Sequence, residues 1–75
     1  MDKETIALII AQNGLGTAAA ILTAKAIKTE GKAAKLPEGE AKTKLAADAN
    51  RARKTAAVLT AANEDVAKYL AILAG

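Results

Sequence analysis

Cysteine, histidine, phenylalanine and tryptophan are all absent from this 75-residue chain. Without cysteine, no disulfide can stabilise the fold. Without histidine, the chain lacks the commonest general base and the commonest metal ligand. Tyr69 is the only aromatic residue, so the large apolar side chains that usually anchor a small core are mostly missing. These absences predict a non-enzymatic protein with no metal, no cofactor and no small-molecule substrate.

What the chain has in abundance is alanine. Hydrophobic residues make up 52% of the sequence, but 21 of these 39 residues are alanine. Alanine has the highest helix propensity, and strand formers are few and do not alternate with polar residues. An alanine methyl also removes little apolar surface from water, and a chain this short is already near the lower limit for one core. We therefore expect an all-α protein that needs an oligomer or a larger protein to complete its packing.

Residues 5–24 contain no charged side chain. Leu8, Leu15 and Leu22 are spaced one heptad apart, which predicts a packing face. Isoleucines fall on the other faces, and a helix that is apolar nearly all round has to be buried on several sides. Asp2 is a candidate N-cap for this helix, which we expect over residues 3–29.

The segment Asn13-Gly14-Leu15-Gly16 allows two interpretations. Asn-Gly is typical of a turn, which would divide the first helix into two. Alternatively, each glycine precedes an alanine by four residues, a spacing that lets another backbone approach closely. We favour one helix, kinked or straight. Residues 14–19 also match the G-x-G-x-x-A form of a dinucleotide-binding turn, but no second strand follows, so nucleotide binding is not expected.

Residues 29–40 hold the clearest break in the pattern. Gly31 suits the position after a helix C-terminus, and Pro37 suits the first turn of the next helix. We therefore predict a basic linker over about residues 30–36 and a second, longer helix over about residues 37–74. Together they form one small helical domain, a two-helix hairpin spanning residues 1–75.

The second helix carries the most regular pattern, an unbroken a/d seam with alternating spacings of four and three. Its middle is alanine, so a partner helix could approach closely there. Because the first helix is expected to be shorter, part of the second is expected to contact other chains. A polar residue at a seam position, here Asn63, could set the register, or it could cap a new helix with Glu64 and Asp65 in its first turn. The seam residues are Leu45, Ala49, Ala52, Ala56, Leu59, Asn63, Val66, Leu70 and Leu73.

Charge is segregated along the chain. Residues 1–24 sum to −1, residues 25–54 to +5 and residues 55–75 to −1, so the turn of the hairpin is basic. The basic residues could form a solvated face, or they could bind phosphate groups of nucleic acid or anionic lipid non-specifically. Base stacking is not expected, since no aromatic residue lies nearby. The candidates for phosphate contacts are Lys42, Lys44, Arg51, Arg53 and Lys54.

The uncharged run of residues 5–24 is also just long enough to cross a bilayer. Gln12, Asn13 and two glycines at its centre favour a helix buried in an assembly instead. No secretory signal is recognised, since Asp2-Lys3-Glu4 is not a basic leader, so we expect the cytoplasm or a virion. The acidic pairs Glu38/Glu40 and Glu64/Asp65 are typical of helix first turns, not of acid–base catalysis.

The hypothesis from the sequence is a structural subunit that packs through alanine-rich helical seams. In size and composition the chain resembles small virion proteins of bacteriophages, which implies a role as a virion or filament component. Its apolar–basic–apolar layout resembles that of conjugative pilins, which implies the alternative of a membrane- or lipid-associated subunit. A third hypothesis is a small basic nucleic-acid-binding protein.

Overall fold

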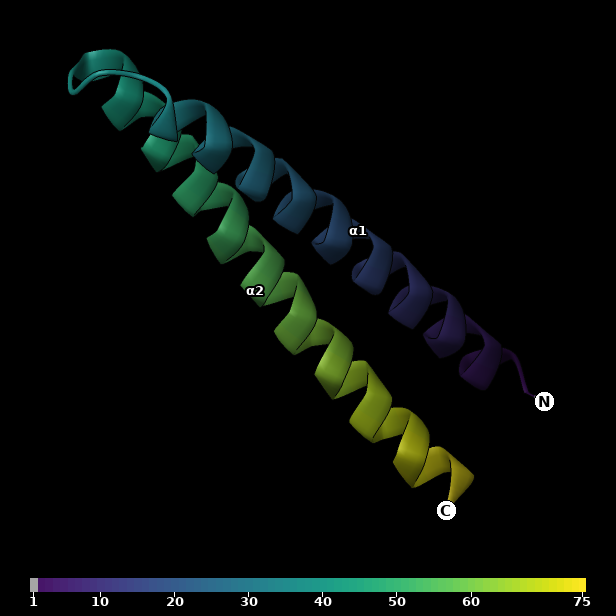
Figure 1. Cartoon of the computed structure of the whole chain (residues 1–75). Helices are drawn as coiled ribbons and strands as arrows, with labels where there is room; N and C mark the ends of the chain where they lie inside the picture. Colours follow the sequence, from purple (N-terminus) through teal and green to yellow (C-terminus); the bar gives the residue numbers. More distant parts are fainter. Residues whose placement is uncertain (1) are drawn as a thin grey trace.

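A computed structural model of the chain, which describes residues 2–75, contains two helices and no strand in that range. Helix α1 spans Lys3–Ala34 and α2 spans Glu40–Ala74, and a five-residue connection joins them. The helices run antiparallel and side by side, with both termini at the end away from the turn (Figure 1). The molecule is a rod of 55 × 13 × 13 Å. The predicted all-α two-helix hairpin is confirmed.

Asp2 caps the start of α1, as predicted. Its Oδ1 accepts a hydrogen bond of 2.7 Å from the backbone N–H of Thr5, and Glu4 occupies the first turn. This bond satisfies one of the N–H groups that a helix leaves unpaired at its start. The same bond stabilises the ionised carboxylate and lowers the pKa of Asp2.

Helix α1 continues without interruption through Gly14 and Gly16, so the single-helix interpretation is confirmed. A Cβ placed on Gly16 would lie 3.6 Å from Nδ2 of Asn63 on α2, whereas one on Gly14 would meet nothing within 4 Å. The G-x-G-x-x-A segment therefore lies inside a helix, without the strand that a dinucleotide turn requires.

The predicted helix ends at the turn are wrong. Helix α1 passes through Gly31 to Ala34, five residues beyond the predicted end, and Pro37 lies in the connection instead of in α2. Ala33 is 6% exposed, and this burial stabilises the extra turn of α1. Proline disfavours helical geometry at the preceding residue, Leu36, which stops α1 from continuing.

Helix α2 starts at Glu40 with Gly39 as its N-cap. Gly39 has φ 157° and ψ −173°, a conformation that other residues rarely adopt. No break occurs near Asn63, so that alternative is wrong.

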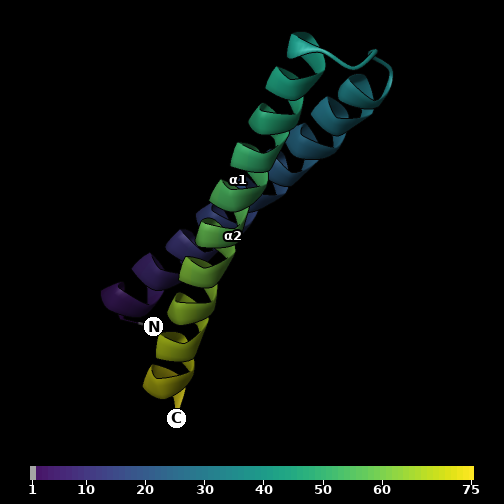
Figure 2. The same cartoon turned by 90° about the vertical axis from the view of Figure 1, so that its left-hand side faces the viewer.

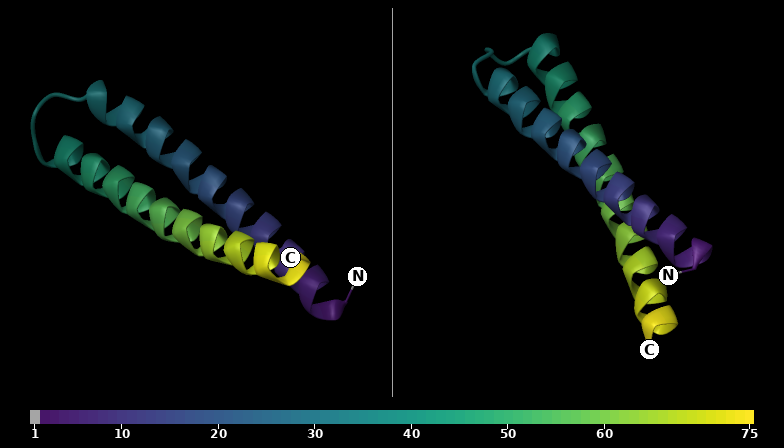
Figure 3. Two further views of the ribbon diagram at one scale, coloured as in Figure 1. Left: turned by 90° about the horizontal axis from the view of Figure 1, so that it is seen from below. Right: turned by 90° about the vertical axis from the view of Figure 1, so that its right-hand side faces the viewer.

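The two helices are nearly equal in length, at 32 and 35 residues, or about 48 and 52 Å at 1.5 Å per residue. The second helix is the longer one, as predicted, but by only three residues. The helices cross at a shallow angle and diverge toward both ends of the rod (Figure 2 and the right-hand view of Figure 3). We call the end away from the turn the open end.

The core consists of alanine. Ala26 is fully buried, and the other core residues are between 2% and 7% exposed. No large side chain is fully buried among residues 2–75. Methyl-sized side chains let two helix backbones approach closely, but they remove little apolar area from water. The five core residues are Ala26, Ala33, Ala49, Ala52 and Ala56.

Replacing Ala52 with leucine should destabilise the hairpin by about 1–3 kcal/mol, because the closely packed seam has no room for three more carbons. Urea denaturation followed by far-UV circular dichroism, at one protein concentration, would measure the change. Ala47→Leu is the matched control, since Ala47 is exposed on the same helix. Equal stability of the two variants would contradict the close-packed seam.

The glycines should respond in opposite directions to alanine substitution. Gly14→Ala should stabilise α1 by about 0.5–1 kcal/mol, since a helical glycine there meets open space. Gly39→Ala should destabilise the hairpin by about 1–3 kcal/mol, since its φ of 157° is strained for alanine. Thermal melts of both variants would test this, and a loss of stability in Gly14→Ala would show that the site is not open.

Candidate assembly interface

The seam predicted on α2 lies toward α1. Its central alanines, Ala49, Ala52 and Ala56, are the buried residues of this helix. At its open end Leu73 is 42% exposed. The remaining members are partly buried: Leu45, Leu59, Asn63, Val66 and Leu70. On α1, Leu8, Leu15 and Leu22 are also partly buried. The seam thus closes tightly near the turn and loosens toward the open end.

Sequence reasoning missed the buried positions of α1, Ala26 and Ala33. They belong to the same heptad pattern as the three leucines, if alanine, glutamine and threonine are also counted as members of that pattern. Every member of the extended series is partly or fully buried. The signal was therefore present, as an unbroken spacing of four and three. The series is Leu8, Gln12, Leu15, Ala19, Leu22, Ala26, Thr29 and Ala33.

Two approaches between the helices define their register. Arg53 donates two hydrogen bonds to the carboxylate of Glu30, of 2.7 Å from Nε and 2.6 Å from Nη2. Toward the open end, Gly16 faces Asn63, whose Oδ1 is buried without a hydrogen-bond partner among the described residues. Antiparallel helices advance in opposite directions at the same rise, so residues 64–68 lie level with residues 11–15.

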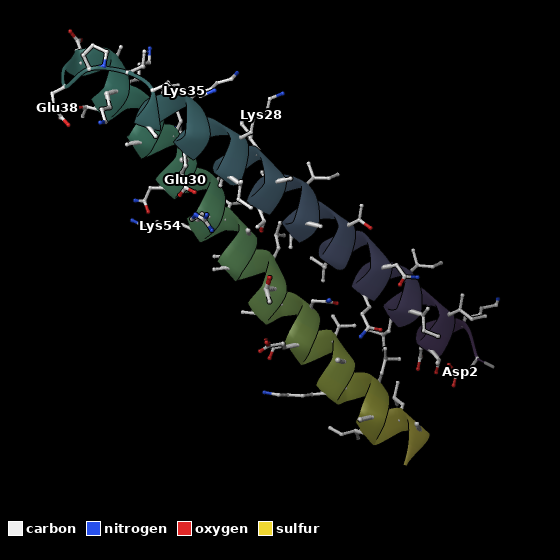
Figure 4. All side chains as sticks on the ribbon, viewed as in Figure 1. Asp2, Lys28, Glu30, Lys35, Glu38 and Lys54 are labelled. Carbon is white, nitrogen blue, oxygen red and sulfur yellow. The ribbon has the colours of Figure 1, made fainter. Side chains whose placement is uncertain are left out.

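Among residues 2–75, Glu30 and Arg53 form the only side-chain ion pair between the helices, and Figure 4 labels Glu30 near the turn. Both side chains are a little under half exposed. The hydrogen bonds from Arg53 and its charge lower the pKa of Glu30. The hydrogen bonds to Glu30 and the negative charge of Glu30 raise the pKa of Arg53. The pair favours this register but, being partly solvated, contributes little stability.

Because the pKa of Glu30 is lower in the folded chain, the pair stabilises the hairpin above the ordinary glutamate pKa of about 4.3. This stabilisation disappears as the pH falls through the folded value. Melting temperatures at pH 6 and pH 3 should therefore differ less in Glu30→Gln than in the original chain. Asp2 contributes in the same direction and remains in both. An unchanged pH dependence would show that the pair is not formed in solution.

The structure does not bring the five phosphate-contact candidates together. Arg51 pairs with Asp48 at 2.7 Å, Lys42 pairs with Glu38 at 3.2 Å, and Arg53 is engaged by Glu30. Helical spacing places Lys44 and Arg51 on one face of α2, and Lys42 and Arg53 on another. The turn end also carries cations for which the described residues supply no ion pair: Lys25, Lys28, Lys32, Lys35, Lys44 and Lys54. Lys28 and Lys35 project on the α1 side and Lys54 on the α2 side (Figure 4). Lys25 and Lys32 line one groove between the helices with Arg51 and Asp48.

Large apolar side chains are exposed on both helices. Four lie on α1 and four on α2, and their exposed fractions run from 42% to 72%. On α1 they are Ile6, Ile10, Ile21 and Ile27. On α2 they are Val58, Tyr69, Ile72 and Leu73. A soluble monomer rarely exposes so many large apolar side chains on so small a surface, so these faces are the candidate interface.

Helix α1 is long and apolar enough to cross a membrane, by length and composition alone. Only 6% of its most apolar window is buried within the hairpin, although α2 partly covers Leu8, Leu15 and Leu22. The rest of this helix is available to another protein or to lipid.

No protein-family model, curated protein or solved structure matches this chain. Inference about its function thus depends on the exposed surface, the register of the helices and the distribution of charge.

Proposed function

We propose that this chain is a non-enzymatic structural subunit that packs through its helix faces into an oligomer or a larger protein assembly. A small component of a phage virion or of a filament fits this description. The proposal rests on one observation: small apolar side chains are buried and large ones are exposed, the reverse of an ordinary core. The buried residues are alanines, while eight large apolar side chains remain exposed.

The exposed area supports this proposal. The hairpin exposes 5478 Å². Folded monomers of 7.6 kDa expose about 4,300 Å², so the excess is about 1,200 Å². Stable protein interfaces bury about 1,200–2,000 Å² in total. Packing against neighbours on one or two sides would return the exposed area to the ordinary range.

A membrane- or lipid-associated subunit is the second candidate, and the apolar exposed surface of α1 favours it. The register counts against insertion of the whole hairpin. Glu64, Asp65 and Lys68 are exposed and lie level with the middle of the uncharged stretch of α1. In a spanning hairpin these side chains would enter the hydrocarbon, where Asp or Lys costs about 2.5–3.5 kcal/mol each.

The basic turn end is the one feature that favours nucleic-acid binding. Its unpaired lysines could contact phosphates, and such contacts weaken steeply with salt. Lys25, Lys32 and Arg51 line one groove between the helices, but Asp48 lies in the same groove and pairs with Arg51.

Sedimentation velocity of the purified chain, with and without mild detergent, should show oligomers without detergent, because the exposed isoleucines associate in water. Flotation with anionic vesicles and a DNA mobility assay would test the other candidates. A compact monomer that melts cooperatively in dilute, detergent-free buffer would contradict the structural-subunit proposal. Oligomers that persist without vesicles or DNA would support it.

A further inference from the structure

Helix α1 carries an uncharged stripe on the side away from α2. Its members recur at spacings of four, three, four and four, so they share one face, and all are exposed. We call it the α1 outer stripe: Ile6, Ile10, Asn13, Thr17 and Ile21. Asn13 is its one amide, at the centre, and isoleucines lie on both sides of it.

Helix α2 carries a comparable stripe beside its seam. Each member directly precedes a seam residue, so the stripe is rotated about 100° from the seam. Four of its members are exposed, and Ala62 is partly buried. We call it the α2 outer stripe: Val58, Ala62, Asp65, Tyr69 and Ile72. Its central residue, Asp65, is also polar.

The two stripes lie at the same height along the rod. Since Gly16 faces Asn63, residues 6–21 of α1 are level with residues 58–73 of α2. Each stripe is about 21–23 Å long at 1.5 Å per residue. Asn13 is therefore level with Asp65, Thr17 is level with Ala62, and the isoleucines are level with the large apolar residues of the α2 outer stripe.

This match identifies the occupant as another copy of the chain. A copy placed alongside, at the same height and in the same orientation, presents its α1 outer stripe to the α2 outer stripe of its neighbour. Isoleucines then meet Val58, Tyr69 and Ile72, and the side-chain amide of Asn13 can donate a hydrogen bond to the carboxylate of Asp65. A bilayer would supply no donor at that height and would leave Asp65 in hydrocarbon.

We propose that copies of the chain associate side by side, with the α1 outer stripe of one hairpin packed on the α2 outer stripe of the next. The contact joins two different faces, so repetition produces a ring or an open array instead of a closed dimer. This inference rests on the structural-subunit proposal and adds to it the partner, the two faces and the shared orientation.

One consequence concerns salt. A shared orientation places the basic turn ends of neighbours together, and they repel one another. Added salt screens charges beyond about 8–10 Å at physiological ionic strength, so association should strengthen as salt rises. A contact dominated by ion pairs across the interface would weaken instead.

Two substitutions test the faces separately. Ile10→Asp disables the α1 outer stripe, and Ile72→Asp disables the α2 outer stripe. These side chains are 66% and 72% exposed, so neither change should unfold the hairpin. Each variant alone should associate roughly tenfold or more weakly than the original chain. Mixed together they should form a one-to-one dimer and nothing larger, because one intact stripe of each kind remains. Asn50→Asp adds the same charge at an exposed position near the turn and should assemble normally.

Sedimentation velocity would measure each sample, and circular dichroism would check helicity. Should an aspartate variant lose its helices, Ile10→Gln and Ile72→Gln provide uncharged substitutes. Full assembly of either variant alone, or no dimer in the mixture, would overturn the proposed contact while leaving a structural role intact. If the original chain itself is a cooperative monomer, both proposals fail together.

Discussion

The close contact of alanines along one seam determines most of this structure. Methyl groups at Ala26, Ala49 and Ala52 let the helices lie near each other, but they bury little apolar area. The seam therefore defines the register of the helices but contributes little hydrophobic stabilisation. Eight of the larger apolar side chains lie outside this core and are exposed, while the leucines of the seam are only partly buried. The close packing of the seam and the exposed apolar surface thus have the same cause, which is the placement of small residues inside and larger ones outside.

Helix content and the α2 seam could be predicted because they depend on local properties. Alanine propensity predicts helices, and unbroken spacing identifies the face that includes Ala52. The helix ends at the turn could not be predicted, because Gly31 is an ordinary C-terminal signal that tertiary packing overrides. Burial of Ala33 extends α1 past it. The α1 seam was obscured because Gln12 and Thr29 interrupt its apolar pattern, although both positions are partly buried.

The candidate interface was predictable only in part. Composition indicates that α1 is apolar on several faces, but the sequence does not show which residues of α2 lie beside which residues of α1. The register supplies that information through the contact of Gly16 with Asn63 and the ion pair of Glu30 with Arg53. With the register known, Glu64 and Asp65 are level with the centre of the apolar stretch. This placement favours packing against protein over insertion of the whole hairpin into a bilayer, a preference that composition alone does not give.

Both chain ends leave the hairpin at the open end, beside the stripes that we assign to neighbouring copies (Figure 1). A bulky fusion at either terminus would therefore crowd the adjoining subunit in a side-by-side array. The short connection between Ala34 and Glu40 projects at the opposite extremity. Labels, epitopes or inserted loops placed there would decorate one rim of the array without obstructing growth.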